Sequence, residues 1–214
     1  MGKLVVIEGI DGSGKSTQLR LLTERLGREG TEFLTVSFPR YDEQSSALIK
    51  MYLGGQFGTR PGDVNAYAAS SFFAVDRFAS YKSEPWGRFY DGGGFVLMDR
   101  YTTSNAVHQG AKLKEAERAE FFRWLYDFEF RLMGLPKPDA VLYMDIDVET
   151  AIQRVRTRAE LQDIHERDSG YMRMCAECSR QAAELLGWTA IDASRAETEI
   201  HERITALVKE VITG

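Results

Sequence analysis

Short apolar runs alternate along the chain with longer segments in which apolar residues recur every three or four positions. The short runs are typical of buried strands and occupy residues 3–8, 32–38, 95–99, 140–145 and 188–192. Strands that alternate with helices form parallel sheets whose two faces those helices cover. The pattern therefore predicts an α/β protein with three layers, α/β/α, built on a five-stranded parallel sheet.

Helical spacing of the apolar residues predicts the elements between these strands. The predicted helices span about residues 16–28, 45–53, 63–81, 116–133, 169–186 and 197–212, and another begins near residue 147. Asp63 is expected to be the N-cap of the third helix. The apolar face of the 116–133 helix is expected in the core and consists of Phe121, Phe122, Leu125, Phe128 and Leu132.

A lid is predicted at about residues 155–168, where the apolar period weakens and the density of charged residues rises. The chain has 214 residues, of which 43% are hydrophobic, enough for one well-filled core but not for two. We therefore expect residues 1–214 to form a single domain that carries this short helical lid.

The first predicted strand and helix enclose a glycine-rich turn with the pattern G-x-x-x-x-G-K-[ST]. Glycines let the backbone approach phosphate oxygens closely, so that its N–H groups and the positive end of the helix dipole face the anion. Lys15 would bridge the β and γ phosphates, and the Ser16 hydroxyl would ligate Mg²⁺. The pattern predicts a nucleoside triphosphate site formed by Gly9, Ile10, Asp11, Gly12, Ser13, Gly14, Lys15, Ser16 and Thr17.

Charged residues also follow the second and third predicted strands, as Phe38-Pro39-Arg40-Tyr41 and Asp99-Arg100-Tyr101. Ligands of doubly wound sheets bind beyond the carboxyl ends of the strands. Arg100 could grip a phosphate bidentately while Asp99 organises Mg²⁺ and its waters. Taken alone, the two residues could equally form a structural salt bridge at the sheet edge.

Together these motifs resemble the thymidylate kinase family. The resemblance rests on residues 8–18, on the two strand-end motifs, on Phe73 with Arg77 one helical turn later, and on Ser104-Asn105. The matches occur in the order in which the family has them. The resemblance implies a P-loop NTP hydrolase-like fold and the transfer of a phosphoryl group from ATP to dTMP with Mg²⁺. It also implies a homodimer.

The resemblance further implies roles on the acceptor side. Phe73 would stack on the thymine ring, Arg77 would hydrogen-bond to its exocyclic oxygen, and Asn105 would read the edge of the base. Without the other motifs, Phe73 and Arg77 could be a core phenylalanine and a surface arginine. The remaining matched residues would line the pocket or contact the acceptor phosphate, the sugar or the metal: Asp11, Phe38, Arg40, Tyr41, Asp99 and Arg100.

Two departures from the family pattern concern the sugar and the donor. His108 stands where many bacterial relatives have an aromatic residue near the sugar 2′ position, which leaves the exclusion of ribose open. The phosphate loop lacks an arginine that some members have, so the catalytic cation is expected from the lid. Arg154 and Arg158 lie one helical turn apart and could face the triphosphate together, whereas Arg156 points elsewhere. Such a charged run could also be a solvated face.

Residues 163–168 resemble the acceptor-side end of the family's lid. Asp163 and His165 are therefore candidate substrate contacts, with His165 where an aromatic residue is frequent. The role of His165 and the choice between Arg154 and Arg158 stay open on the sequence alone.

Composition restricts the partners and the compartment. The net charge of -5 and the pI near 5.4 argue against nucleic acid partners, which need broad basic surfaces. No apolar run approaches the length of a membrane span and no signal-peptide pattern follows Met1, so we expect a cytoplasmic protein without membrane contact. Cys175 and Cys178 are interpreted as reduced thiols on neighbouring helical turns rather than as part of a zinc site.

Two other functions are alternatives to a nucleoside monophosphate kinase. A deoxynucleoside kinase would need a carboxylate base near the sugar 5′ hydroxyl. Glu8 is the candidate, but Arg40, Tyr41 and Arg100 would then have no acceptor phosphate to bind. A nucleotide-dependent switch of the GTPase type is disfavoured because the chain has no N-K-x-D motif. The sequence does not rank dTMP against dUMP or identify a regulatory partner.

Overall fold

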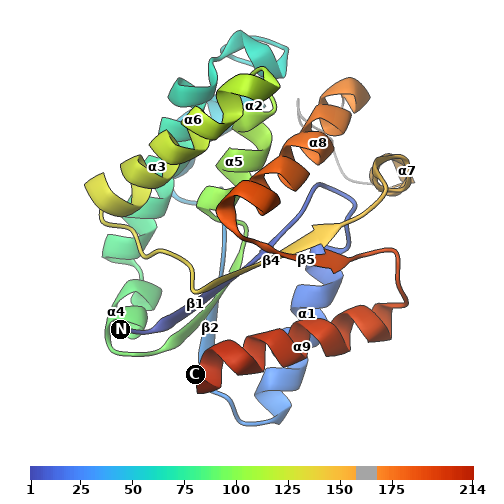
Figure 1. Cartoon of the computed structure of the whole chain (residues 1–214). Coiled ribbons are helices and arrows are strands. Elements are labelled where there is room, and N and C mark those ends of the chain that lie inside the picture. The colour runs from blue at the N-terminus through green and yellow to red at the C-terminus, as the bar shows by residue number, and fades with distance from the viewer. Residues whose placement is uncertain (158–167) are drawn as a thin grey trace.

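Five parallel strands form the centre of the protein. In the computed structural model, which describes residues 1–157 and 168–214, they are β1 (Lys3–Glu8), β2 (Phe33–Ser37), β3 (Phe95–Asp99), β4 (Ala140–Asp145) and β5 (Thr189–Asp192). Their order across the sheet is β2-β3-β1-β4-β5, and every neighbouring pair is parallel (Figure 1). The predicted five-stranded parallel sheet is confirmed.

The chain adds its strands on one side of β1 first and on the other side afterwards, so β1 is the switch point of the sheet. From β1 the chain builds β2 and β3 on one side, and it then crosses to build β4 and β5 on the other. Connections that diverge in this way leave a crevice at the carboxyl ends of the strands, where doubly wound proteins bind their ligands. The glycine-rich turn follows β1 directly and therefore lies at this point.

Helices cover both faces of the sheet and complete the three predicted layers. On one face α1 (Lys15–Arg28) packs beside α9 (Glu197–Thr213) (Figure 1). The layer on the other face consists of α3 (Ala66–Ser83), α5 (Thr102–Gly110), α6 (Glu115–Tyr126) and α8 (Ser169–Leu186). Three further helices flank this layer: α2 (Ala47–Leu53), α4 (Pro85–Asp91) and α7 (Val148–Thr157).

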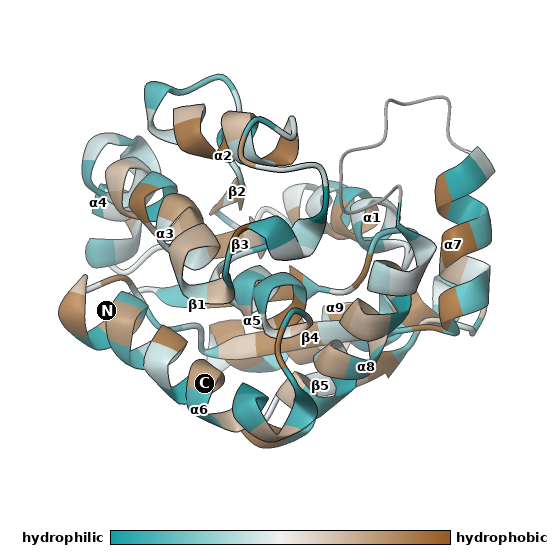
Figure 2. Ribbon diagram, turned by 90° about the horizontal axis from the view of Figure 1, so that it is seen from above, coloured by the Kyte–Doolittle hydropathy of each residue, from teal (hydrophilic) through white to brown (hydrophobic). Residues whose placement is uncertain are grey.

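The strand β1 is apolar on both of its faces because helices cover both sides of the sheet. Leu4, Val5, Val6 and Ile7 are completely buried, as expected of a central parallel strand. Along α7, by contrast, hydrophobic and hydrophilic residues alternate (Figure 2), and only one side of that helix is buried. The apolar pattern that predicted β1 thus reflects burial on two sides.

The start of α3 differs from the prediction. Asp63 is not its N-cap, because it closes a short 3₁₀ turn, Pro61–Asp63, and accepts the N–H of Arg60 at 3.0 Å. Asn65 caps α3 instead, since its Oδ1 accepts the N–H of Ala68 at 2.9 Å. Both residue types cap helices well, and the one directly before the helical run takes the position.

The helix predicted at residues 116–133 changes type along its length. After α6 ends at Tyr126, residues Asp127–Leu132 form a π-helix, whose i→i+5 hydrogen bonds change the direction in which the following side chains point. The prediction that Leu132 lies in the core is therefore wrong, since 62% of its surface is exposed. Glu129 is completely buried in this segment.

The helix α8 carries both cysteines and follows the predicted lid. Its N-cap is Asp168, whose Oδ1 accepts the N–H of Tyr171 at 3.0 Å. Cys175 and Cys178 are buried free thiols, as predicted. Most of the predicted lid, residues 158–167, lies outside the described residues. Within the two described ranges, no helix combines the length and the apolar character needed to cross a membrane.

Candidate active site

The loop after β1 wraps around the ammonium group of Lys15. Gly9 and Gly12 adopt positive φ angles of 157° and 83°, and the angle at Gly12 lies in the region that favours glycine. Nζ of Lys15 donates to the carbonyl oxygens of Gly9 at 2.7 Å and of Ile10 at 3.1 Å. Burial lowers the pKa of Lys15 to about 8, and the positive charge of Arg100 acts in the same direction. The loop thus encloses a cation that an anionic ligand would stabilise.

The start of α1 offers polar groups to such a ligand. Ser16 is exposed in the first turn of the helix, where backbone N–H groups lack partners within the helix. The Ser13 hydroxyl is buried and makes no hydrogen bond to the described residues. Donors of this kind at a helix N-terminus match the oxygens of a phosphate group.

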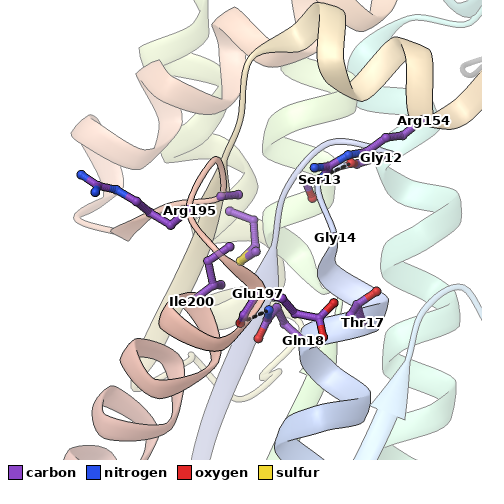
Figure 3. A pocket seen from close by; sticks show the side chains of 11 residues that line it. Gly12, Ser13, Gly14, Thr17, Gln18, Arg154, Arg195, Glu197 and Ile200 are labelled. Carbon is purple, nitrogen blue, oxygen red and sulfur yellow. Dashed lines mark hydrogen bonds between the residues drawn. The ribbon is translucent and has the colours of Figure 1, made fainter.

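A pocket of about 340 Å³ lies beside the loop, between α1 and the turn that follows β5. Arg154 and Arg195 stand on opposite sides of it (Figure 3). Nη1 of Arg154 donates to the carbonyl oxygen of Gly12 at 3.2 Å, so this arginine of α7 reaches the phosphate loop. Gln18 and Arg195 also line this pocket and were not predicted from the sequence. Arg195 could have been found because it follows the carboxyl end of a predicted strand.

Arg100, which follows β3, forms a salt bridge with Asp11 of the phosphate loop. Nη2 of Arg100 bonds to the Asp11 carboxylate, and Nη1 lies 3.1 Å from Nε2 of His108. Burial disfavours the charge of the guanidinium, but Asp11 and other nearby carboxylates outweigh burial and raise the pKa of Arg100. Arg100 also has a φ of 65°, the only positive φ of a non-glycine residue in the described ranges. Such backbone angles concentrate at functional sites.

Asp99 is not the partner of Arg100. Its carboxylate instead accepts a hydrogen bond from the hydroxyl of Ser37, at 3.3 Å, across the carboxyl ends of β3 and β2. Asp99 therefore lies half-buried at the edge of the crevice, while Arg100 bonds to Asp11 on the neighbouring strand's loop.

His108 connects Arg100 to α8. Its Nδ1 lies 3.6 Å from the sulfur of Cys175, and its carbonyl oxygen accepts a hydrogen bond from the hydroxyl of Tyr171. A small cavity of about 10 Å³ lies among these side chains and Asp11. The structure thus brings together His108, Asp11 and Arg100, three residues that the sequence analysis grouped on the acceptor side.

Two carboxylates hold the motif after β2, one within α3 and one directly after this helix. Asp76 is buried and accepts the N–H of Arg40 at 2.8 Å, while the Arg40 guanidinium pairs with Glu84 at 2.9 Å. Phe38 is buried, forms a cis peptide bond with the following proline, and packs its ring against the ring of Tyr101. Tyr41 is 48% exposed. The backbone of this motif is therefore fixed, while Tyr41 stays accessible.

Arg77 and Asn105 both bond to Glu129, which was not predicted as a site residue. Glu129 accepts two hydrogen bonds from Arg77 and one from the Asn105 amide. All three side chains are almost completely buried. Phe73 is half-buried one turn before Arg77 and packs edge-on against the ring of Tyr52. The position of Glu129 between Phe128 and Phe130 was the sequence signal for a buried carboxylate.

Glu8 is committed to structural hydrogen bonds. Its buried carboxylate accepts the N–H of Gly9 at 2.9 Å and the hydroxyls of Thr103 and Ser104, each at 2.6 Å. These bonds tie the end of β1 to the start of α5. A general base needs a free lone pair aimed at the reacting hydroxyl. The geometry therefore does not support Glu8 as the base of a deoxynucleoside kinase.

Three predicted site residues, Arg158, Asp163 and His165, lie outside the described residues. In the part of the chain that the structure describes, no group of three or more His, Cys, Asp or Glu side chains could hold a metal ion. In nucleotide sites Mg²⁺ commonly binds one or two carboxylates together with phosphate oxygens and water.

A phosphate loop at the switch point of a parallel sheet, with arginines on both sides of it, defines a P-loop nucleotide kinase. The arrangement of donor pocket, loop and Arg100 suits transfer between two phosphates. A model of the thymidylate kinase family matches residues 7–204. The chain therefore belongs to the thymidylate kinase family, whose enzymes transfer a phosphoryl group from ATP to dTMP.

Individual relatives agree with this assignment. The thymidylate kinase of Mycobacterium tuberculosis is 35% identical over 173 residues, which are 78% of each chain. A probable thymidylate kinase of Pyrobaculum aerophilum is 31% identical over 208 residues, 97% of each chain. Human thymidylate kinase is 28% identical over 214 residues, which cover 99% of this chain and 92% of the human protein.

Proposed function

We propose that this chain transfers the γ-phosphoryl group of Mg²⁺-bound ATP to dTMP, giving dTDP and ADP, with the residue roles given below. The observation that carries the proposal is the salt bridge between Asp11 of the phosphate loop and Arg100 of the acceptor side. It brings a guanidinium to the loop that binds the donor phosphates, which is where two phosphate groups must meet.

On the donor side, the backbone from Gly9 to Thr17 binds the triphosphate and Lys15 contacts its β and γ phosphates. The adenosine occupies the pocket between Arg154 and Arg195. Ser16 and Asp99, with Asp11, supply oxygen ligands, the kind that Mg²⁺ prefers. When bound there, the ion neutralises charge on the phosphates.

On the acceptor side, Arg100 and Tyr41 bind the phosphate of dTMP, with Arg40 near the same motif. Phe73 stacks on the base, Phe38 forms a wall of the pocket, and His108 lies near the sugar. Arg77 and Asn105 bind the edge of the base. From the lid, Asp163 and His165 contact the substrate.

No general base is needed, because the acceptor is already an anion and charge spreads over the transferred phosphoryl group. Catalysis then depends on position and on cations. Lys15 and Arg100 neutralise the transferred group together with a lid arginine, Arg154 or Arg158. Arg154 already contacts the loop at Gly12, which supports its role.

A homodimer formed through α3 is part of the proposal. Tyr67, Val75 and Phe78 are spaced to share one side of α3, and they are 40%, 51% and 37% exposed. Apolar residues of one helix face that remain exposed are typical of an interface. Light scattering after gel filtration should give a dimer mass, and Val75→Glu should shift it to the monomer mass. We further propose a soluble cytoplasmic enzyme.

The activity is tested by measuring ADP production from ATP with a panel of acceptors. We expect turnover with dTMP, and none with thymidine, which has a hydroxyl in place of the phosphate. Turnover with thymidine and not with dTMP would favour a deoxynucleoside kinase. Adding GTP in place of ATP, without an acceptor, tests the GTPase-type switch, for which no hydrolysis is expected.

A further inference from the structure

A buried ion pair connects α3 to the π-helix that follows α6. The side chains of Arg77 and Glu129 are 2% and 0% exposed. Nε and Nη2 of Arg77 donate to the two oxygens of Glu129 at 2.7 and 2.6 Å, in a bidentate arrangement. Because removing two charges from water is costly, a buried pair is weak evidence for a role in stability. Its contacts instead lead into the acceptor site.

Glu129 also orients two polar side chains of α5. It accepts the hydroxyl of Thr102 at 2.7 Å and the amide nitrogen of Asn105 at 3.3 Å. The same amide nitrogen donates to the carbonyl oxygen of Ser70 at 3.1 Å. A carboxylate and a carbonyl can only accept, so the NH₂ group of Asn105 must face them. Its Oδ1 must therefore face away from Glu129 and Ser70.

Two atoms of this network make no hydrogen bond to the described residues: the donor Nη1 of Arg77 and the acceptor Oδ1 of Asn105. A donor and an acceptor together are complementary to a pyrimidine edge with a carbonyl O4 and an N3–H, as in thymine and uracil. Cytosine reverses both groups, because its N3 accepts and its N4 amino group donates. Its edge would place donor against donor and acceptor against acceptor.

We propose that Glu129 is a positioning residue that sets the base specificity of this kinase. By holding the guanidinium of Arg77 and the orientation of the Asn105 amide, Glu129 selects the pyrimidine edge with N3–H and O4 and rejects cytosine. This inference rests on the proposed function, in which Arg77 and Asn105 bind the edge of the base. Glu129 itself acts only through these two neighbours.

The test is to measure kcat and KM for dTMP, dUMP and dCMP with the wild-type protein and with Glu129→Gln. Glutamine keeps the shape of the side chain but replaces one acceptor oxygen with an NH₂ group. It therefore accepts only one hydrogen bond from Arg77 in the present geometry, and it leaves the Ser70 carbonyl as the one acceptor that still orients the Asn105 amide. We expect the dTMP:dCMP ratio of kcat/KM to fall at least about 10-fold, since the loosened Arg77 and Asn105 penalise the reversed edge less. The dTMP:dUMP ratio should change less than about 3-fold, because both bases share the N3–H and O4 edge.

A second variant guards against loss of the fold, since Glu129→Gln leaves the buried charge of Arg77 without its partner. Glu129→Asp keeps the negative charge but is one methylene shorter, so that it pairs with Arg77 and no longer reaches Asn105. We expect a smaller fall in the dTMP:dCMP ratio than in Glu129→Gln, with a rise in KM for dTMP larger than the fall in kcat. The matched control is Glu177→Gln, which removes the charged partner of another buried arginine, Arg118, at 2.7 Å between α6 and α8. Arg118 also donates to Gln181 at 3.2 Å. The dTMP:dCMP ratio of Glu177→Gln should equal that of the wild type.

Melting curves establish which variants are folded. A dTMP:dCMP ratio that is unchanged in the folded Glu129 variants overturns the inference, and so does an equal loss with all three nucleotides, which a purely structural role predicts. A wild-type dTMP:dCMP ratio near one also overturns it. A wild-type protein that phosphorylates none of the three monophosphates would contradict the proposed function itself.

Discussion

Gly12 of the phosphate loop lies directly against the backbone of Ala151 in α7. A Cβ atom at position 12 would overlap the carbonyl oxygen of Ala151, and the φ of Gly12 is +83°. The carbonyl oxygen of Gly12 also accepts a hydrogen bond from Arg154, one turn further along the same helix. The absence of a side chain at Gly12 therefore determines how closely the helix that carries Arg154 approaches the triphosphate site.

Because Gly12 lies against α7 and Gly14 does not, we expect alanine to be more damaging at Gly12 than at Gly14. Gly14 has a φ of +95°, and a Cβ there would meet no atom within 4 Å. Gly14→Ala should cost only backbone strain, about 1–2 kcal/mol of unfolding free energy. Gly12→Ala should cost more, because α7 must also move, and it should weaken ATP binding by at least about 10-fold. Urea unfolding and calorimetric titration with ATP test this. Equal losses in the two variants would contradict it.

Arg154 should act on turnover more than on binding. With Arg154→Met we expect kcat to fall by about 10³, since a cation placed at the transferring phosphoryl group is worth about that much in related reactions. KM for ATP should change much less. Arg156→Met is the matched control, because Arg156 is exposed on a different side of α7, and it should leave kcat unchanged. A fall in kcat with Arg156→Met, or none with Arg154→Met, would assign the cation elsewhere in the lid.

The sheet was predictable because each strand is a short apolar run, and the three central strands β1, β3 and β4 are buried on both sides. All five predicted strands are present within one residue at either end. The helices α4 and α5 were not predicted. In Thr102–Gly110 the buried positions include Thr102, Thr103, Asn105 and Gln109, so an apolar period is absent. Thr102, Thr103 and Asn105 occupy buried positions because they bond to Glu129 and Glu8, which is a tertiary effect.

The phosphate loop could be read from the sequence because its function depends on local backbone geometry. The pairing of residues distant in the chain could not. Arg100 bonds to Asp11 rather than to its neighbour Asp99, and Arg77 bonds to Glu129, 52 residues away. Nothing in the local pattern indicates which carboxylate a given arginine will meet. The missed Glu129 also lies in a π-helix, which apolar periodicity does not predict.

Both thiols should be unreactive in the folded protein. Burial raises the pKa of Cys178 to about 12 and that of Cys175 well above its usual range. At pH 8 neither residue is a thiolate, the form that reacts. Titration with Ellman's reagent should release almost no colour from the native protein and two equivalents in urea, because the chain has only two cysteines. Rapid release of one equivalent from the native protein would show that a thiol is accessible.

The binding of ATP should weaken as the pH rises through the pKa of Lys15. Burial lowers this pKa from 10.5 to about 8, so the ligand-free protein loses the positive charge above pH 8. Only the protonated form attracts the β and γ phosphates. We expect log(kcat/KM) for ATP to be flat below pH 8 and to fall by about one per pH unit above it. In the ATP complex, the phosphate charges raise the pKa again, so kcat should stay constant to a higher pH.

The lowered pKa of Lys15 also makes the stability of the ligand-free protein depend on pH. Stability should rise with pH, whereas ATP binding should weaken. Between pH 8 and 10.5 the unfolded chain binds the Lys15 proton and the folded protein does not, so this group makes the ligand-free protein more stable as the pH rises. Below pH 8 the buried charge costs about 3 kcal/mol, from the 1.36 kcal/mol that corresponds to each pKa unit. Burial also lowers the pKa of Lys112 to about 7, and this group titrates in both proteins. Between pH 7.5 and 9.5 the free energy of unfolding in urea should therefore change more favourably in the wild type than in Lys15→Met. A rise of equal size in Lys15→Met would mean that another group titrates.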